Sequence, residues 1–509
     1  MPLIAGFGVL IHTKSRRTFL QIHTIMMMRH ILLLLLSFGL GAHAVPKLSP
    51  LFSDNMVIQQ NADAPIWGTA KPGKAVTVSC SWSGKVVTAK AGPNGRWMAT
   101  VRTPKAGGPH SITVSDGKKV VINGVMAGEV WLCSGQSNME YPVKGWTSVL
   151  NADEELANSV HPGIRLLQVH KVASVAPSAR LVTNSPTWQV CGPSTLPEFS
   201  AIAYFFAREI SAKEGVPVGV IDATWGGSNI ESWISAETLR LMPDCRDSID
   251  RAAYMPWRNS PAALYNGMIS PLVPMAMRGV LWYQGEQNEL RGWQYRDLFT
   301  MLIRDWRRKW HADRLPFYFV QLANFHERRN EPVEALWAEL REAQDMALRL
   351  PATGMASAID VGLGNDVHYP NKQEVARRLS LIALANIYGH DCVFTGPRYM
   401  NHIIGDSRVL VEFSDVAGGL VQRGGHISGF TVAGPDHVWH NAEARIVDGD
   451  AGLVEVWADG VSMPVAVRYL WQDNPEVTLY NGAGLPACPF RTDDWPLLSY
   501  GKYRSNSDY

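Results

Sequence analysis

The sequence has few cysteines, no clear excess of charge of either sign, and neither an internal repeat nor a low-complexity linker. Its six cysteines, in 509 residues, form no Cys-x-x-Cys pair, which argues against a zinc knuckle. The formal net charge is +1 and no basic patch is evident, so nucleic acid is not an expected partner. With 46% hydrophobic and 18% charged residues, the composition excludes a disordered or fibrous chain.

Residues 1–44 have the features of an export signal. Arg29 precedes the apolar run 31–41, and the small-residue sequence Ala-His-Ala at 42–44 follows it as a cleavage site. The run is too short to span a bilayer comfortably, which favours a signal peptide over a membrane anchor, and no later segment is a candidate span. We therefore expect an exported protein, periplasmic or secreted, that has no membrane partner after cleavage. The signal holds four of the 47 basic and none of the 46 acidic residues, so the mature net charge is −3.

The length predicts two or three domains, and the pattern of elements divides the chain further. Residues 45–122 contain short alternating runs between turn signals, which predicts a β-sandwich-like module. Residues 391–509 return to a β-rich pattern. The part between, 123–390, alternates strand and helix patterns and carries the motifs discussed below.

This middle part predicts an α/β fold with a mainly parallel sheet covered by helices on both faces. The expected strands are 128–134, 216–223, 278–284, 317–325 and 355–362, and the expected helices are 200–215, 293–310, 333–350 and 372–389. In such sheets ligands bind beyond the carboxyl ends of the strands, so the segments that follow the strands are the candidates for a site.

The first candidate is Gly-Gln-Ser-Asn-Met, which follows the strand 128–134 and contains Ser137. A serine hydroxyl becomes a nucleophile only with a base within hydrogen-bond reach. Taken alone, the motif is more often a turn or a helix N-cap. It also differs from the Gly-x-Ser-x-Gly elbow, because Met139 stands at the position of the second glycine.

Two further segments could supply donors to an oxyanion. Gly226 and Gly227 permit a turn that aims a backbone amide, and Gln284 and Asn288 flank Glu286 in Gln-Gly-Glu-Gln-Asn. A glycine turn without a ligand and a buried polar turn that satisfies its own backbone are the competing interpretations.

The fourth segment carries an acid and a base, Asp366 and His368, in one loop before the last helix of the α/β part. A carboxylate can orient the imidazole while the other ring nitrogen faces the serine. A zinc site at His437 and His440 is the alternative, but no third ligand lies nearby in the sequence. Serine, donors and acid-base loop all follow strands that should point the same way, which favours the serine hydrolase.

With these residues in this order, the sequence resembles the sialate O-acetylesterase family, exported carbohydrate esterases of the SGNH-hydrolase type. The resemblance covers nearly all of the mature chain and is carried by LFSDNMVIQQ, GEVWLCSGQSNMEYPV, WYQGEQN, HYPNKQEVARRL and LYNGAGLPACPFRTD. It implies a three-layer α/β/α catalytic domain flanked by N-terminal and C-terminal β-rich modules, and a carboxylic-ester hydrolase without metal or organic cofactor.

The resemblance also implies roles for individual residues. Ser137 matches the nucleophile, His368 the base, and Gly227, favoured over Gly226, a donor of the oxyanion hole, to which Gln284 or Asn288 adds an amide. The acid stays open between Asp366, Asp360 and none, because this chain has Asn365 three residues before His368, where many relatives have Asp.

The implied substrate is an O-acetylated saccharide, in the first place 9-O-acetylated sialic acid. An acetylxylan esterase and a catalytically inactive carbohydrate-binding protein are the alternatives. A sialate site should offer a cation to the carboxylate, and the sequence offers Arg291, Arg296, Arg468 and Arg491. The aromatic side chains expected to stack on a sugar are Trp225, Trp233, Trp282 and Tyr141.

Overall fold

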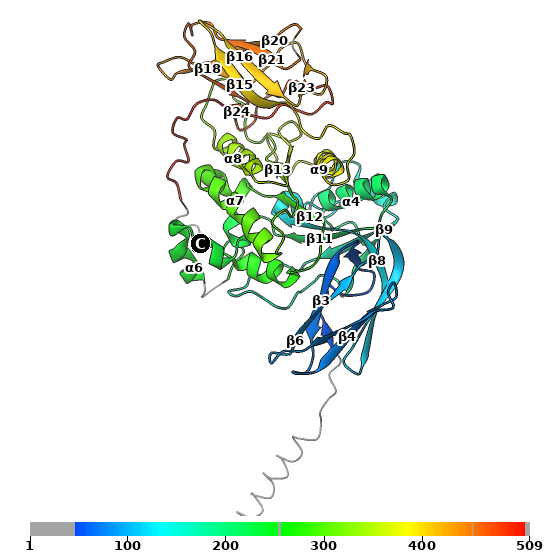
Figure 1. The fold of residues 1–509 in the computed structure, drawn as a ribbon. Helices are drawn as coiled ribbons and strands as arrows, with labels where there is room; N and C mark the ends of the chain where they lie inside the picture. The colour runs from blue at the N-terminus through cyan, green and yellow to red at the C-terminus, as the bar shows by residue number, and fades with distance from the viewer. Residues whose placement is uncertain (1–45, 253–255, 450, 504–509) are drawn as a thin grey trace, which may run out of the picture.

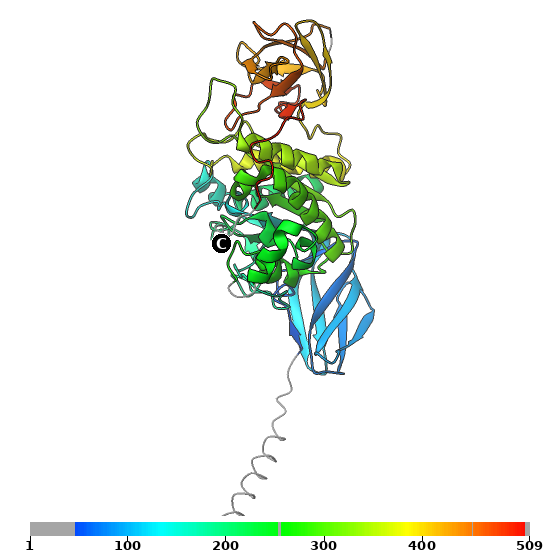
Figure 2. The same cartoon turned by 90° about the vertical axis from the view of Figure 1, so that its left-hand side faces the viewer.

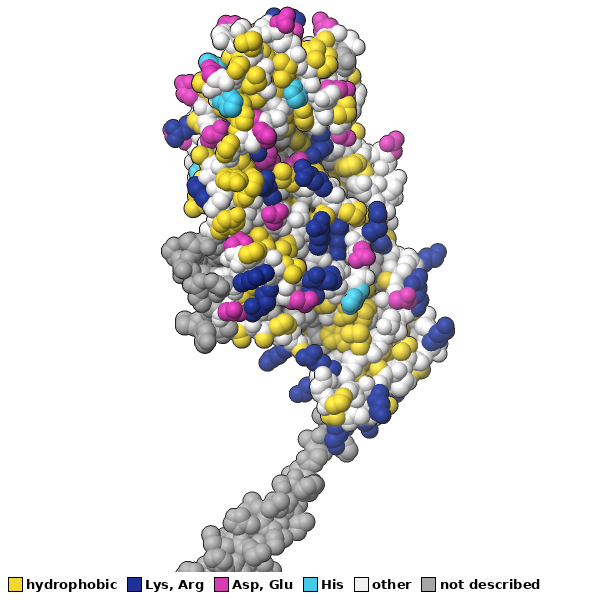
Figure 3. Space-filling model, turned by 60° about the vertical axis from the view of Figure 1, so that its left-hand side comes forward, with side chains coloured by type: hydrophobic (Ala, Val, Ile, Leu, Met, Phe, Trp, Pro, Cys, Tyr) yellow, Lys and Arg dark blue, Asp and Glu magenta, His cyan; other side chains and the backbone are white. Residues whose placement is uncertain are grey.

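The computed structural model describes residues 46–252, 256–449 and 451–503, and the predicted signal peptide lies outside these residues. A β module lies at each end of an elongated molecule, with the α/β part between them (Figures 1 and 2). Within the described ranges, no helix has the length and apolar character that crossing a membrane requires. Lys and Arg side chains are frequent over the α/β part on the face in Figure 3, with acidic side chains among them.

The central sheet has the strand order β10-β9-β11-β8-β12-β13-β14. All of these strands run parallel except β10, which is antiparallel to β9. Their bounds are β8 (Lys119–Gly135), β9 (His161–Gln168), β10 (Gln189–Cys191), β11 (Val218–Thr224), β12 (Gly279–Tyr283), β13 (Phe317–Gln321) and β14 (Thr353–Ser357). The predicted parallel α/β fold is confirmed, although the sequence did not indicate β9 and β10.

Helices cover both faces of this sheet. Phe317 and Phe319 of β13 pack against Phe299 of α7, whereas Trp131 of β8 packs against Phe206 of α4 and lies beside Tyr318. Because neighbouring side chains of a strand point to opposite faces, α4 and α7 lie on opposite sides of the sheet. The helices with their bounds are α2 (Ser137–Glu140), α3 (Ala152–Ala157), α4 (Ala201–Glu214), α5 (Ala236–Leu239), α6 (Arg246–Ala252), α7 (Gly292–Lys309), α8 (Leu336–Asp345) and α9 (Lys372–Asn386).

The helix boundaries follow the capping signals of the sequence. Ser200 caps α4, its hydroxyl accepting a hydrogen bond from the Ala203 N–H, and Gly215 ends the helix in a left-handed conformation. Asn371 caps α9 in the same way through the Glu374 N–H. The predicted helix 333–350 is interrupted, because α8 ends at Asp345 and a 3-10 turn, η6 (Met346–Arg349), continues it.

The N-terminal module shares a strand with the central sheet. The first half of β8 pairs with β7 and β2, and its second half, from Glu129 to Gly135, pairs with β11 and β12. This 17-residue strand therefore runs through position 122/123 without interruption. The other strands of the module are β1 (Lys47–Leu48), β2 (Val57–Gln59), β3 (Asp63–Thr69), β4 (Ala75–Cys80), β5 (Val86–Lys90), β6 (Arg96–Arg102) and β7 (Gly107–Ser115).

The C-terminal module has a hydrophobic core of its own, formed by side chains such as Val411, Phe430 and Tyr469. Two four-stranded sheets and one strand pair build it, in the orders β15-β16-β21-β20, β19-β18-β22-β24 and β17-β23. The bounds are β15 (Arg398–Ile404), β16 (Val409–Ser414), β17 (Leu420–Gln422), β18 (Phe430–Ala433), β19 (Trp439–Asn441), β20 (Glu443–Ile446), β21 (Leu453–Trp457), β22 (Ala466–Tyr469), β23 (Leu479–Asn481) and β24 (Phe490–Arg491).

Candidate active site

The four candidate segments all lie past the carboxyl ends of strands of the central sheet. Ser137 is the first residue of α2, two positions after the end of β8. The two glycines follow β11, Gln284 follows β12, and His368 lies in the loop between β14 and α9. Because β11, β8 and β12 are neighbours in the sheet, their carboxyl ends bring the serine between the two donor segments.

The Ser137 hydroxyl and the His368 imidazole meet across 231 positions of sequence. Ser137 Oγ lies 2.9 Å from His368 Nε2, which is a hydrogen bond. Burial lowers the pKa of His368, the positive charge of Lys372 lowers it further, and Asp366 and Glu140 oppose this shift. The imidazole is therefore neutral near pH 7 and can accept the proton of the serine.

The two candidate acids are engaged in different ways. The Asp366 carboxylate accepts the backbone N–H of His368 at 2.8 Å, so it fixes the loop that carries the base. Asp360 is held by the Arg378 guanidinium through two hydrogen bonds of 2.6 and 2.9 Å. Among the described residues, no hydrogen bond joins the His368 ring to a carboxylate.

The two glycines differ in what their amides do. The Gly226 N–H donates to Glu140 Oε2 at 2.6 Å, whereas the Gly227 N–H has no acceptor in the described part of the chain. Gly227 has φ +66°, a conformation that glycine adopts without strain. A Cβ atom at Gly226 would lie 3.2 Å from the Cβ of Ser137, so this turn closely approaches the serine. As the first residue of α2, Ser137 also has an N–H without an intrahelical acceptor.

Gln284 and Asn288 are both fully buried, but only one of them retains a donor. The Gln284 amide donates to Ser228 O at 3.1 Å and to Asn288 Oδ1 at 2.8 Å, and its oxygen accepts from Tyr295. Asn288 donates one amide hydrogen to Glu231 Oε2 at 3.0 Å, which leaves the second. Gln284 therefore orients Asn288, and Asn288 is the better placed of the two to serve an oxyanion.

A buried network beside the serine was not predicted from the sequence. Asn138 donates to Glu286 Oε1 at 2.6 Å and to the Val367 carbonyl at 3.0 Å, and it accepts from Lys372 Nζ at 2.6 Å. The Lys372 ammonium lies 3.5 Å from the centroid of the Tyr369 ring. Burial lowers the pKa of Lys372 and raises that of Glu286. Because Asn138 follows Ser137 and Val367 precedes His368, the network ties Ser137 to the loop that carries His368.

The exposed aromatic side chains near the site are not those that the sequence suggested. Trp233, Trp282 and Tyr141 are buried and do not offer open rings to a sugar, whereas Trp225 is partly exposed. Trp146 is 54% exposed and its ring lies edge-on to that of His368, with 5.1 Å between centroids. Since Trp146 lies outside every motif that we recognised, no local signal indicated it.

The four arginines considered for a substrate carboxylate already have partners. Arg291 binds Glu231 and Gln294, and Arg296 stacks on Trp293, 3.3 Å from its ring centroid. Arg468 donates two hydrogen bonds to Asp493 and one to Glu334. Arg491 donates one hydrogen bond to Asp493 and one to Glu342.

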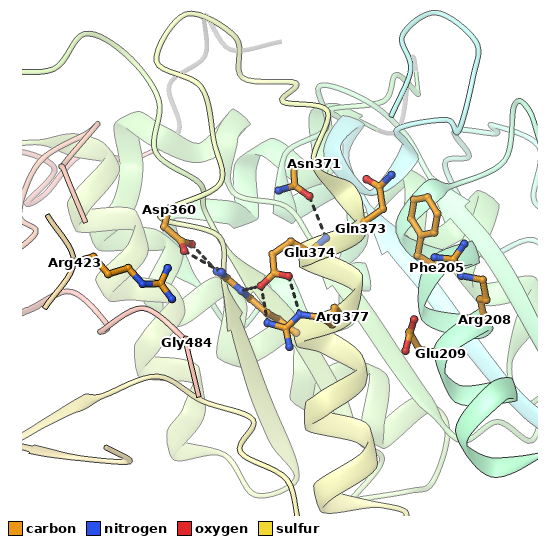
Figure 4. A pocket seen from close by; sticks show the side chains of 11 residues that line it. Phe205, Arg208, Glu209, Asp360, Asn371, Gln373, Glu374, Arg377, Arg423 and Gly484 are labelled. Atoms are coloured by element: carbon orange, nitrogen blue, oxygen red, sulfur yellow. Dashed lines mark hydrogen bonds and ion pairs between the residues drawn. The ribbon is translucent and has the colours of Figure 1, made fainter. Parts of the chain in front are cut away.

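A cavity of about 440 Å³ lies next to this site but does not contain it (Figure 4). It is lined by α4, α9 and the C-terminal module, and neither Ser137 nor His368 reaches it. Inside it, Glu374 binds Arg377 and Arg378, and Arg378 binds Asp360. Most of its charges are paired with one another, so the cavity offers fewer free groups than the segment around Ser137 and His368.

The proposed alternative, a zinc site at His437 and His440, has a different local structure. The His437 ring is stacked on that of Trp495, with 3.9 Å between centroids. In the part of the chain that the structure describes, no group of three or more His, Cys, Asp or Glu side chains is arranged to hold a metal ion.

Comparison with known proteins identifies the family. The profile of the family "Carbohydrate esterase, sialic acid-specific acetylesterase" matches residues 127–381. The sialate O-acetylesterase of Mus musculus is 31% identical over 406 residues, 68% of this chain and 74% of that protein, and that of Homo sapiens is 29% identical over 389 residues, 69% and 73%. The crystal structure of a carbohydrate acetylesterase from Xanthomonas citri superposes with a TM-score of 0.80 at 38% identity, covering 89% of this chain and all of that one. The chain thus belongs to the sialic acid-specific acetylesterase family and is a carbohydrate esterase, a carboxylic-ester hydrolase.

Proposed function

We propose that the enzyme removes O-acetyl groups from sialic acids, with Ser137 as nucleophile and His368 as general base. The observation that carries the catalytic assignment is the 2.9 Å hydrogen bond between Ser137 Oγ and His368 Nε2. Sialic acid is supported as the acyl carrier by the family description and by the names of the mammalian relatives.

The reaction has two halves. As Ser137 Oγ attacks the acetyl carbonyl carbon, His368 Nε2 takes the hydroxyl proton and the carbonyl oxygen becomes an oxyanion. The N–H groups of Ser137 and Gly227, with the remaining amide hydrogen of Asn288, are the donors available to that oxyanion. The ester bond to the sugar then breaks, and the imidazolium returns its proton to the departing sugar oxygen.

Water completes the cycle on the acetyl-serine. His368 removes a proton from the water, whose oxygen attacks the acetyl carbon, and the same donors hold the second oxyanion. The bond to Ser137 Oγ breaks, the imidazolium protonates Oγ, and acetic acid leaves. The low pKa of His368 keeps the imidazole unprotonated, as each half requires at its start.

The direct test compares Ser137→Ala with the wild type on p-nitrophenyl acetate and on O-acetylated sialic acid. We expect the variant to lose about a thousandfold or more in kcat on both, as serine hydrolases do without their nucleophile. Equal rates for variant and wild type would refute the assignment of Ser137. Acetate release by the wild type from O-acetylated sialic acid and from acetylated xylan then decides between the sialate esterase and the acetylxylan esterase.

The orienting acid is tested by a matched pair of substitutions. Asp366→Asn removes the charge that strengthens the hydrogen bond to the His368 N–H, and Asp360→Asn removes the charge that pairs with Arg378. We propose that Asp366 is the residue that positions the base, so kcat should fall in the first variant, while the second should mainly lower thermal stability. A larger loss of kcat in Asp360→Asn would reverse this assignment.

We also propose that the protein is exported to the periplasm or the medium. The support is the basic residue, apolar run and cleavage site within residues 1–44. Fractionation of cells that express the full chain, with N-terminal sequencing of the product, tests the proposal, and a cytoplasmic product that retains these residues would contradict it.

A further inference from the structure

One arginine beside Ser137 has no acidic partner among the described residues. Arg258 forms no ion pair and no side-chain hydrogen bond with the described residues, and its Nε is buried without a hydrogen-bond partner. Its guanidinium lies 4.6 Å from the centroid of the Trp257 ring, which is 48% exposed. A buried donor without an acceptor is costly, and a bound ligand that offers an acceptor would remove that cost.

The position of Arg258 is fixed against the glycine turn. A Cβ atom at Gly227 would lie 3.3 Å from Arg258 Nη2 and 3.4 Å from Cζ, so the guanidinium covers that glycine. The neighbouring residue strengthens the connection, because the Asn259 side chain accepts the Asn229 N–H at 2.8 Å. A side chain at 227 would press the guanidinium aside by a few tenths of an ångström, and the positive φ of this residue favours glycine.

The same turn lies against the nucleophile on its other side. A Cβ atom at Gly226 would lie 3.2 Å from the Cβ of Ser137 and 3.3 Å from Glu140 Oε2. Ser137 therefore lies against Gly226, and Arg258 lies against Gly227. The guanidinium and the reacting serine are thus separated by this two-glycine turn. A cation at this place can contact a part of the substrate beyond the acetyl group.

The other cations close to the serine are already bound. Lys171 Nζ lies 2.5 Å from Glu140 Oε1, and Lys372 Nζ is bound to Asn138 and enclosed by tyrosine rings. The four arginines that the sequence suggested have partners elsewhere. Within the described ranges, this leaves Arg258 as a cation near Ser137 whose guanidinium donates no hydrogen bond.

We propose that Arg258 binds the carboxylate of the acetylated sugar and so selects acidic saccharides of the sialic acid type. The assignment rests on the proposed function, because it assumes that the sugar bound at Ser137 is acidic. The guanidinium fork matches a carboxylate with two parallel hydrogen bonds, which a neutral xylan chain cannot offer. In a sialic acid the carboxylate is several bonds away from an acetyl group on the side chain. The cation that binds it should therefore stand away from the nucleophile, as Arg258 does on the far side of the two-glycine turn.

The test measures selectivity rather than activity alone. kcat/KM is determined for O-acetylated sialic acid and for its methyl ester, in which the carboxylate has lost its charge, with wild type, Arg258→Gln and Arg304→Gln. Arg304 is an exposed residue of α7 without an ion pair among the described residues, so it controls for the loss of one positive charge. We expect the wild type to prefer the acid over the ester about ten- to a hundredfold, and Arg258→Gln to abolish this preference.

Each outcome has a distinct meaning. If Arg304→Gln retains the preference and Arg258→Gln loses it, the inference holds. If Arg258→Gln keeps the preference, or if it loses kcat/KM equally on both substrates, the inference is overturned, the second result indicating that the guanidinium serves the oxyanion or the fold. If the wild type releases no acetate from O-acetylated sialic acid but does so from acetylated xylan, the proposed function is refuted. The inference about Arg258, which rests on it, is then refuted as well.

Discussion

The buried side chain of Asn138 makes the sharpest prediction, because it joins three parts of the site at once. It donates to Glu286 and to the Val367 carbonyl and accepts from Lys372, at 2.6, 3.0 and 2.6 Å. Asn138→Ala removes all three bonds and leaves the partners buried. At about 1–2 kcal/mol for each bond, the free energy of unfolding should fall by about 3–6 kcal/mol.

The substitution should also lower the rate of the reaction, since Val367 immediately precedes His368, the proposed base. A displacement of the imidazole by about 1 Å costs on the order of a hundredfold in rate, so kcat on p-nitrophenyl acetate should fall by about that factor while KM changes little. The assay is run at a temperature at which circular dichroism shows the variant to be folded. Thermal midpoints by the same method report the change in stability.

Two further variants separate volume from hydrogen bonding. Asn138→Asp keeps the size and the bond from Lys372 but turns a carboxylate toward Glu286 Oε1, so its loss of kcat should be at least as large as that of Asn138→Ala. Asn158→Ala changes an exposed asparagine and should leave both readouts unaltered. If Asn138→Ala keeps kcat within threefold of the wild type and an unchanged midpoint, the network does not position the site.

Three other predictions follow from the geometry of the serine and the base. The pKa of His368 is lowered, so kcat/KM should rise with pH along an acid limb with its midpoint below 6.5. Lys372→Met should move this limb to higher pH, because the positive charge of Lys372 lowers the pKa of His368. A limb that does not move would mean that the Lys372 amine carries no charge. Gly226→Ala places a methyl group 3.2 Å from the Cβ of Ser137. It should lower kcat on p-nitrophenyl acetate by about tenfold or more without lowering the thermal midpoint strongly. A kcat equal to that of the wild type would show that Ser137 can shift freely. Trp146→Ala removes the exposed ring that packs against His368 and should raise KM for O-acetylated sialic acid more than for p-nitrophenyl acetate, whereas an equal change in both would exclude a contact with the sugar.

Much of the central fold could be predicted, because its strands and helices carry local signals. The buried strand β12 is a continuous apolar run and β11 is largely apolar, and α4 begins and ends at the Ser and Gly that the sequence offers as caps. The strand β9 was missed because its first residues, His-Pro-Gly, indicate a turn, and its pairing with β11 overrides that local preference.

The site was predictable in its backbone positions and less so in its side-chain partners. Parallel strand ends bring Ser137 and His368 to one edge, which follows from topology alone. The role of Gln284 could not be predicted in the same way, because its amide hydrogens are donated to Asn288 Oδ1 and to the Ser228 carbonyl in the segment after β11. Arg258 carries no motif, and only the fold reveals that it covers Gly227.

The single strand that serves two sheets has a practical consequence for anyone who divides this protein. A fragment that begins at residue 123 would discard the first four residues of β8 and would leave the next ones without β7 and β2. Its new edge would offer unpaired backbone groups to other chains, which favours aggregation. Truncation and domain exchange should therefore keep residues from 46 onward together with the α/β part, because the N-terminal strands support the strand that ends just before Ser137.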